Sequence, residues 1–149
     1  MNYFSTAICF MLFAFNSYAQ DLVKLNEATI NKTTDGNLIT IVLPFDIVEG
    51  YHIQSEIESA GGSIMTEVMF EENDLFEIIS FEYSKKLSEE LVLNEYTHHV
   101  LIDAFEVTVI LKLNENNPNP KLNGQLYYQA CTNKQCLFPR TLNFEVPNI

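Results

Sequence analysis

Hydrophobic and polar residues alternate with a period of two along most of the chain. Six stretches show the alternation clearly: residues 38–47, 64–70, 75–83, 105–113, 126–130 and 141–146. Successive side chains of a β-strand point to opposite faces of a sheet, so each stretch predicts a strand with one buried face. Their spacing leaves room for about seven to nine strands.

Turn-forming residues separate these stretches. The separators contain Gly, Asn, Asp or Pro, and they are residues 34–37, 49–50, 61–62 and 114–120. These residue types favour the backbone conformations of tight turns, so strand and turn alternate along the chain. Only residues 84–93 have the pattern of a helix, and this helix would be short. The order predicts one all-β domain, an immunoglobulin-like antiparallel β-sandwich, rather than an α/β fold.

The first twenty residues have a different character. An apolar run over residues 7–15 is followed by Ser17-Tyr18-Ala19, the small-residue pattern of a secretory cleavage site. The run is shorter than the about 20 residues that cross a bilayer, and no later run is longer. We therefore expect a signal peptide over residues 1–19 and one domain over residues 20–149, periplasmic or secreted, with no membrane anchor after cleavage. Because no Lys or Arg precedes the run, a retained anchor or a buried first strand is the alternative.

Composition narrows the classes of partner. Of the 149 residues 47% are hydrophobic, which indicates a folded chain with a core. The net charge of -12 comes from 20 acidic residues against only eight Lys and Arg. A phosphate backbone would be repelled by such a chain, so we expect no nucleic-acid partner.

Two cysteines carry the candidate chemistry. Cys9 lies in the leader, and its removal leaves Cys131 and Cys136, an even number in an exported protein. A disulfide between them is therefore expected. Alternation places Leu126, Tyr128 and Ala130 on one face of their strand and Cys131 on the other face, at its end. The four polar residues 132–135 separate the cysteines, which thus bracket a surface loop.

The residues alone leave a structural bridge and an exchanging bridge both open. A ring of about six residues constrains the unfolded chain by roughly 2 kcal/mol, against about 4.7 kcal/mol for a hundred-residue loop. Lys134 and Arg140 supply positive charge that favours a thiolate, the species that attacks a disulfide. Tyr127, Tyr128 and Phe138 either shield the sulfurs or are ordinary core and rim residues.

A metal site is the third interpretation of these cysteines. The chain has three histidines, His52, His98 and His99, but the last two point to opposite faces if they lie on a strand. The CTNKQC spacing also lacks the two-residue separation of most zinc knuckles. GxSxG, HExxH and glycine-rich phosphate motifs are absent. We therefore expect neither a metal nor a cofactor.

The sequence YYQACTNKQCLFPRTLNFEV, residues 127–146, resembles the N-terminal periplasmic domain of the DsbD family of thiol:disulfide interchange proteins. The shared features are a Tyr-Gln pair, a small residue, a cysteine, a short polar spacer, a second cysteine and a proline. They correspond here to Tyr128, Gln129, Ala130, Cys131, Cys136 and Pro139. GYHIQSE, residues 50–56, is similar to an aromatic-His-Ile turn found earlier in such domains.

The resemblance implies an immunoglobulin-like domain that relays electrons without a cofactor. Its dithiol-disulfide pair, Cys131 and Cys136, would take electrons from a thioredoxin-like protein or a membrane disulfide reductase and pass them to oxidised periplasmic proteins. Cys136 would attack and Cys131 would resolve the mixed disulfide. The chain has no transmembrane or thioredoxin-like domain, so the donor is expected to be a separate protein.

The resemblance also implies an aromatic cap loop over the cysteines. The candidates here are Phe81, Tyr83 and the stretch around Leu91.

The alternative function is a secreted immunoglobulin-like binding module without catalytic activity. In such a module the bridge between Cys131 and Cys136 is a fixed structural disulfide.

Overall fold

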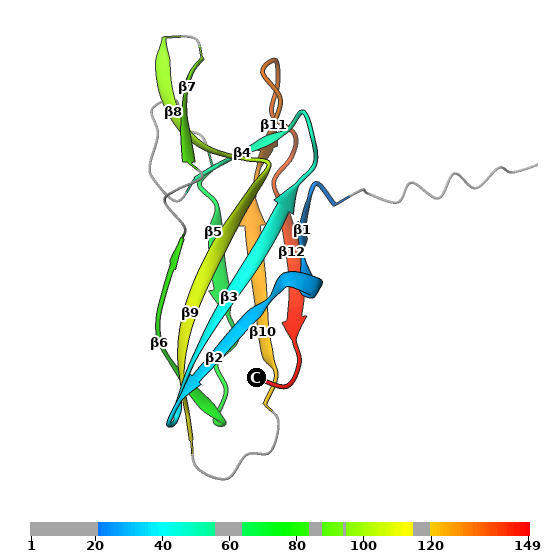
Figure 1. Cartoon of the computed structure of the whole chain (residues 1–149). Helices are drawn as coiled ribbons and strands as arrows, with labels where there is room; N and C mark the ends of the chain where they lie inside the picture. The colour runs from blue at the N-terminus through cyan, green and yellow to red at the C-terminus, as the bar shows by residue number, and fades with distance from the viewer. Residues whose placement is uncertain (1–20, 56–63, 84–87, 94, 115–119) are drawn as a thin grey trace, which may run out of the picture.

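The protein is described by a computed structural model that covers residues 21–55, 64–83, 88–93, 95–114 and 120–149. These residues form twelve β-strands and one 3-10 turn, η1 (Glu27–Thr29), so the predicted all-β class is confirmed (Figure 1). The strands are β1 (Val23–Leu25), β2 (Asn31–Asp35), β3 (Leu38–Ile47), β4 (His52–Gln54), β5 (Glu67–Phe70), β6 (Phe76–Tyr83), β7 (Ser88–Leu93), β8 (Tyr96–Ile102), β9 (Ala104–Leu113), β10 (Leu122–Tyr128), β11 (Ala130–Cys131) and β12 (Arg140–Val146).

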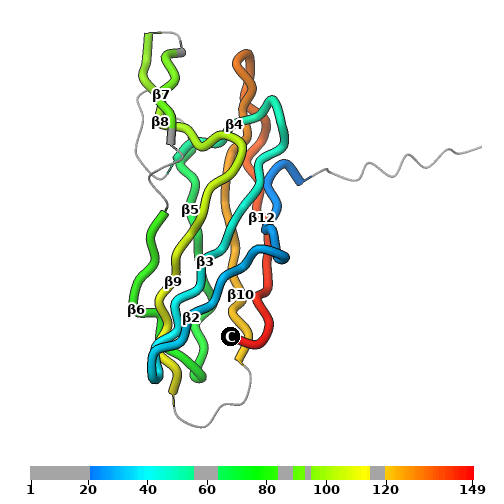
Figure 2. Tube along the Cα trace, in the orientation of Figure 1, coloured from blue at the N-terminus to red at the C-terminus, as the bar shows by residue number. Residues whose placement is uncertain are grey.

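The strands pair in three antiparallel sheets. The first has the order β1-β3-β9-β6, with β2 also paired to β3, and the second has the order β12-β10-β5. These two sheets form the long body of the molecule (Figure 2). The third, β11-β4-β8-β7, lies at one end of that body, opposite the end where the chain reaches its C-terminus (Figure 1). The predicted antiparallel sandwich is confirmed.

Aromatic side chains join the two long sheets. Phe45 on β3 stacks on Phe105 of β9 with ring centroids 5.1 Å apart, and both are fully buried. Phe144 on β12, in the facing sheet, meets Phe45 edge to face at 5.5 Å. Burial of a Phe side chain contributes about 1.5–3 kcal/mol, so each of these rings stabilises the packing of one sheet on the other.

The predicted helix over residues 84–93 is wrong in the part that the structure describes. Ser88–Leu93 form β7, which pairs with β8 from Ser88↔Leu101 to Leu93↔Tyr96. Pairing with a neighbouring strand overrides the weak local preference for a helix. Residues 84–87 lie outside the described residues.

Other sequence predictions also fall outside the described part of the chain. They are the signal peptide up to residue 19, the turn at residues 61–62, and most of the Asn- and Pro-rich separator at residues 114–120. Among the residues that are described, none belongs to a helix long and apolar enough to cross a bilayer.

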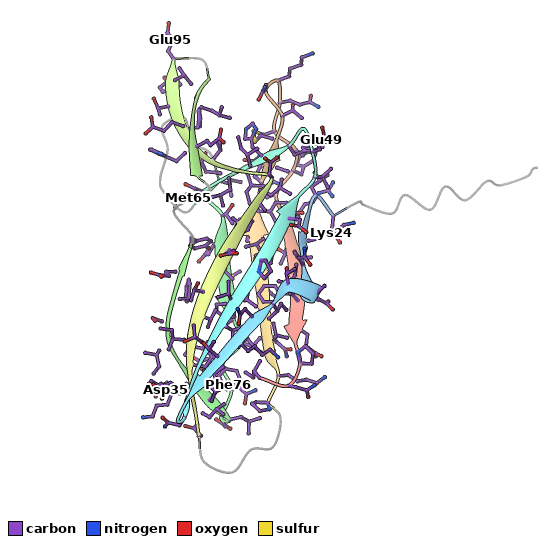
Figure 3. The ribbon with its side chains drawn as sticks, in the orientation of Figure 1. Lys24, Asp35, Glu49, Met65, Phe76 and Glu95 are labelled. Carbon is purple, nitrogen blue, oxygen red and sulfur yellow. A yellow bond between two sulfur atoms is a disulfide. The ribbon has the colours of Figure 1, made fainter. Side chains whose placement is uncertain are left out.

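The turn at Glu49–Gly50 directs the chain from the body into the sheet at its end. Gly50 has φ +84°, a left-handed conformation that glycine adopts without the cost borne by other residues. The amide of Tyr51 donates a hydrogen bond to the carbonyl oxygen of Val48 at 3.1 Å and closes the turn. Strand β4 therefore starts immediately after the turn. Figure 3 shows Glu49 at the end of the molecule that also carries Glu95, whereas Asp35 and Phe76 lie at the opposite end.

Candidate redox site

The strand that carries the first cysteine changes partners just before it. Strand β10 pairs with β12 and β5 as far as Tyr128, and after Gln129 the chain pairs with β4 through Ala130↔Ile53 and Cys131↔His52. Tyr128 and Ala130, which alternation places on one face, are both buried in the core. The change of partner places Cys131 in the sheet at the end of the molecule.

The two cysteines form the expected disulfide. The Sγ atoms are 2.02 Å apart, and the Cα atoms of Cys131 and Cys136 are separated by 3.9 Å. The amide of Leu137 donates to the carbonyl oxygen of Ala130 at 2.8 Å, so the chain leaving Cys136 runs back alongside β11. The Gln129 side chain donates to the carbonyl oxygen of Leu137 at 2.9 Å and holds the same segment.

The loop between the cysteines is closed by its own polar groups. The amide of Thr132 donates to the carbonyl oxygen of Gln135 at 2.8 Å. The Thr132 hydroxyl accepts hydrogen bonds from the amides of Lys134 at 3.3 Å and Gln135 at 3.2 Å. Such side-chain-to-backbone bonds are typical of Ser and Thr in tight turns. The disulfide therefore closes an ordered turn at the tip of a hairpin.

The two cysteines differ in exposure. Cys131 is only 9% exposed, whereas Cys136 is an exposed residue. Of the two residues of the bridge, Cys136 is therefore the more accessible from solvent.

A small pocket lies against the disulfide. Its volume is about 40 Å³, enough for about one water molecule. It is lined by side chains from three segments of the chain: His52, Gln54, His98, Val100, Gln129, Cys131 and Cys136. The register explains the convergence, because Cys131 lies opposite His52 and Gln54 lies opposite Val100. Residues that face each other across paired strands share one face of the sheet.

His52 is the buried titratable side chain of this pocket. It is 6% exposed, and burial lowers its pKa below the ordinary histidine value. The nearby His98 lowers this pKa further, because two imidazolium ions would repel each other. His52 is therefore neutral near pH 7.

Hydrogen bonds fix β4 beside the pocket. The Gln54 side chain donates to the carbonyl oxygen of His99 at 2.6 Å, and the Ser55 amide donates to the same oxygen at 2.8 Å. The Thr66 hydroxyl donates to the carbonyl oxygen of Gln54. These bonds tie β4 to β8 and to the residues that lead into β5.

The charged and aromatic neighbours predicted from the sequence do not line the disulfide pocket. Lys134 is exposed on the loop, and Arg140 pairs with Tyr128 at the start of β12. Tyr128 is buried in the core, where its hydroxyl accepts a hydrogen bond from the Leu22 amide at 3.3 Å. Tyr127 lines a different pocket, and Phe138 is 92% exposed. The described residues that line the disulfide pocket therefore include none of the three predicted shielding aromatics.

The candidates for an aromatic cap over the cysteines lie in two different parts of the molecule. Phe81 packs edge to face against Phe70 with ring centroids 5.5 Å apart, and the Tyr83 hydroxyl accepts a hydrogen bond from the Val68 amide at 2.7 Å. Both therefore belong to the body of the sandwich. Leu91 pairs with His98, so the two side chains share a face of the terminal sheet. Of the candidates, Leu91 is the one placed beside the pocket.

From the sequence, His52 and His98 were considered beside the cysteines only as metal ligands, and Gln54 was not considered. The signal is present at residues 52–54, where a polar, an apolar and a polar residue follow one another directly after a glycine turn. Alternation separates His98 from His99, as predicted, and places only His98 on the pocket. The described residues contain no group of three or more His, Cys, Asp or Glu arranged to hold a metal ion.

Comparison with known proteins gives a likeness of fold. No protein-family model matches the sequence, and no curated protein matches it. The N-terminal periplasmic domain of ScsB from Proteus mirabilis superposes with a TM-score of 0.57 at 11% identity, over 88% of this chain and 47% of that chain. The DsbD n-terminal domain of Neisseria meningitidis superposes with a TM-score of 0.48 at 17% identity, over 78% of this chain and 82% of that chain.

A third structure, the GAE domain of GGA2p from Saccharomyces cerevisiae, gives a TM-score of 0.43 at 11% identity, over 80% of this chain and 88% of that chain. The chain thus spans about half the length of the ScsB structure. The resemblance drawn from the sequence is confirmed at the level of the fold, which is similar to that of part of the ScsB N-terminal periplasmic domain.

Proposed function

We propose that the protein is a thiol-disulfide exchange domain, in which Cys131 and Cys136 cycle between a disulfide and a dithiol. The observation that carries the proposal is the asymmetry of the pair, with Cys136 exposed at the tip of a hairpin and Cys131 only 9% exposed on the sheet beneath it. One reachable sulfur and one protected sulfur are what two successive exchange steps require.

Reduction of the domain proceeds through a mixed disulfide. A partner thiolate attacks the Sγ atom of Cys136, a bond forms between the two sulfurs, and the bond between Cys131 and Cys136 breaks with its electron pair left on Cys131. The second thiolate of the partner then attacks the partner's own sulfur in the mixed disulfide and releases Cys136. The partner leaves as a disulfide, and the domain has gained two electrons and two protons.

The reduced domain passes the electrons on by the reverse sequence. The Cys136 thiolate attacks a disulfide of the substrate protein and forms a new mixed disulfide. Cys131 then attacks Cys136, the bridge of the domain forms again, and the substrate is released as a dithiol. No cofactor takes part, because sulfur atoms carry the electron pair throughout.

The partners follow from this chemistry. The donor is a thioredoxin-like protein or a membrane disulfide reductase, and the acceptors are oxidised proteins outside the cytoplasm. The expected signal peptide over residues 1–19 would bring the domain to that compartment. Disulfides persist there, so substrates are available.

The rival is a binding module whose disulfide is fixed. The two functions differ in the reduction potential of the bridge, since structural disulfides in exported proteins lie below about -300 mV and exchanging ones lie higher. We expect a potential above that value, measured by equilibration with glutathione buffers. A lower potential would favour the binding module.

Serine variants test the exchange itself. We expect the oxidised protein to be reduced by a reduced thioredoxin-like protein, and Cys136→Ser to be inert because the reachable sulfur is gone. Cys131→Ser, mixed with the oxidised form of the partner, should instead accumulate the mixed disulfide at Cys136, because Cys136 opens the partner's disulfide and no Cys131 is present to resolve it; the product is visible on a non-reducing gel. Asn133→Ser, in the same loop, keeps both sulfurs and is the control that should behave as wild type. Unchanged exchange in Cys136→Ser would exclude the mechanism.

A further inference from the structure

The residue across from the protected cysteine is a histidine. Cys131 and His52 are paired on adjacent strands, and both line the 40 Å³ pocket. Side chains of directly opposed residues have their Cβ atoms about 5 Å apart. The imidazole of His52 and the sulfur of Cys131 are therefore neighbours on one face of the sheet.

The proposed exchange creates a charge at this place. When the bond between the cysteines breaks, Cys131 holds the electron pair as a thiolate, and this residue is only 9% exposed. A buried anion is costly unless a proton or a hydrogen-bond donor reaches it. In the opposite direction Cys131 has to lose its proton before it can attack, because the thiolate is the nucleophile.

We propose that His52 is the proton acceptor and donor for Cys131 during thiol-disulfide exchange. This inference rests on the proposed function and assigns a role within the same site. In the resolving step the Cys131 thiol gives its proton to the imidazole, and the resulting thiolate attacks Cys136 of the mixed disulfide. The bridge forms, the partner leaves with the electron pair as a thiolate, and the imidazolium returns its proton to that thiolate or to water.

Two observations distinguish His52 from other basic groups. Lys134 is exposed on the loop, on the solvent side of the disulfide. His98 lines the same pocket from β8, which is one strand further from β11 than the strand that carries His52. His52 alone of the three occupies the strand next to Cys131.

The surroundings keep His52 in the form that accepts a proton. The described titratable groups on its side of the sheet are His98 of the pocket, Tyr96 two residues before it on β8, and Glu89, which pairs with Val100 on the same face. Burial and His98 both lower the pKa of His52, so a neutral imidazole awaits the thiol proton at pH 7.

The resolving step can be measured without the natural partner. The reduced protein reacts with the chromogenic disulfide 5,5'-dithiobis(2-nitrobenzoate), Cys136 forms a mixed disulfide, and the attack by Cys131 releases a second coloured thiolate at a rate independent of protein concentration. A free thiol is only a few per cent thiolate at pH 7, so we expect His52→Gln and His52→Asn to slow this release about tenfold or more at pH 7. The deficit should shrink toward pH 9, where the thiol ionises unaided.

His99→Gln is the matched control. His99 follows His98 on β8 and lies on the opposite face, so the release rate and its pH profile should equal those of wild type. Equal rates and equal pH profiles in the His52 variants, with folding confirmed by circular dichroism, would overturn the inference. That result would leave the proposed thiol-disulfide exchange unaffected. A wild-type protein that never releases the second thiolate would instead exclude the proposed function.

A second measurement needs no substitution at His52. In Cys136→Ser the remaining thiol is Cys131, and its ionisation can be followed by ultraviolet absorbance or by the pH dependence of alkylation. If His52 accepts the proton of this thiol, the two groups titrate as a coupled pair, and the thiolate signal should rise in two steps rather than one. A single titration step would contradict the role of His52 even if the His52 variants did not fold.

Discussion

The body of the sandwich and the sheet at its end have opposite kinds of interior. In the body the interior is apolar, with Phe45 and Phe105 stacked and fully buried. In the sheet at the end of the body, β11-β4-β8-β7, the interior is partly polar. The buried polar residues of the described chain lie on β4, directly after it, or hydrogen-bonded to it, and they are His52, Gln54, Ser55 and Thr66.

Because of this difference, the body of the sandwich contributes mainly stability, and the sheet at its end contributes chemistry. Apolar burial stabilises a fold in proportion to the area removed from water, with no demand on orientation. Buried polar groups stabilise only when they are hydrogen-bonded, and in return they fix positions and supply groups that can exchange protons. The body therefore holds the domain together, and the end provides the environment of the disulfide.

The largest effect on stability is expected from the body. Phe45→Ala removes a fully buried ring that contacts two others, and should lower the free energy of unfolding by about 3–5 kcal/mol. Phe138→Ala is the matched control, because that ring is 92% exposed and its loss should cost less than about 0.5 kcal/mol. Urea unfolding of the oxidised proteins measures both values, and equal losses would refute the division between body and end.

A smaller effect is expected when the disulfide is removed. Replacing Cys131 and Cys136 together by Ser should lower the free energy of unfolding by about 2 kcal/mol, because the bridge closes a ring of only about six residues. Exchange should be lost completely. A loss of stability as large as that of Phe45→Ala would show that the bridge is the main staple of the fold and would favour the fixed-disulfide module.

The smallest expected effect is on how the stability of the domain changes with pH. A histidine whose pKa is lower in the folded than in the unfolded state binds fewer protons when folded. The contribution of His52 is therefore present above about pH 6.5 and is lost as the pH falls below that value toward the lowered pKa. Unfolding of the oxidised domain between pH 7.5 and 5 should show a steeper loss of stability in wild type than in His52→Gln. His99→Gln should follow wild type, and identical slopes in all three would contradict the lowered pKa.

The sequence was most informative where the pattern is long or the contact is local. The ten residues of β3 were predicted from alternation with their observed bounds, because a regular run of that length suits only a half-buried strand. The disulfide was predicted because two cysteines are left after the expected removal of the signal peptide, an even number in a chain expected to be exported.

The features that the sequence did not predict depend on contacts between distant segments of the chain. Strand β4 has three residues and β11 has two, too few for a periodic signal. Their pairing brings His52 opposite Cys131 although the two lie far apart in the chain. The helix predicted in place of β7 failed for a similar reason, since β7 owes its conformation to pairing with β8.

The glycine turn before β4 has a consequence for how such a site can evolve. His52 and Ile53 occupy consecutive positions, so they face opposite sides of the terminal sheet, one toward sulfur and the other into the core. Insertion or deletion of one residue at the Gly50 turn would exchange these faces, burying an imidazole among hydrocarbons and presenting a methyl group to the disulfide. The length of this turn therefore sets which side of the terminal sheet His52 occupies, and a one-residue change in it should remove the imidazole from the disulfide pocket.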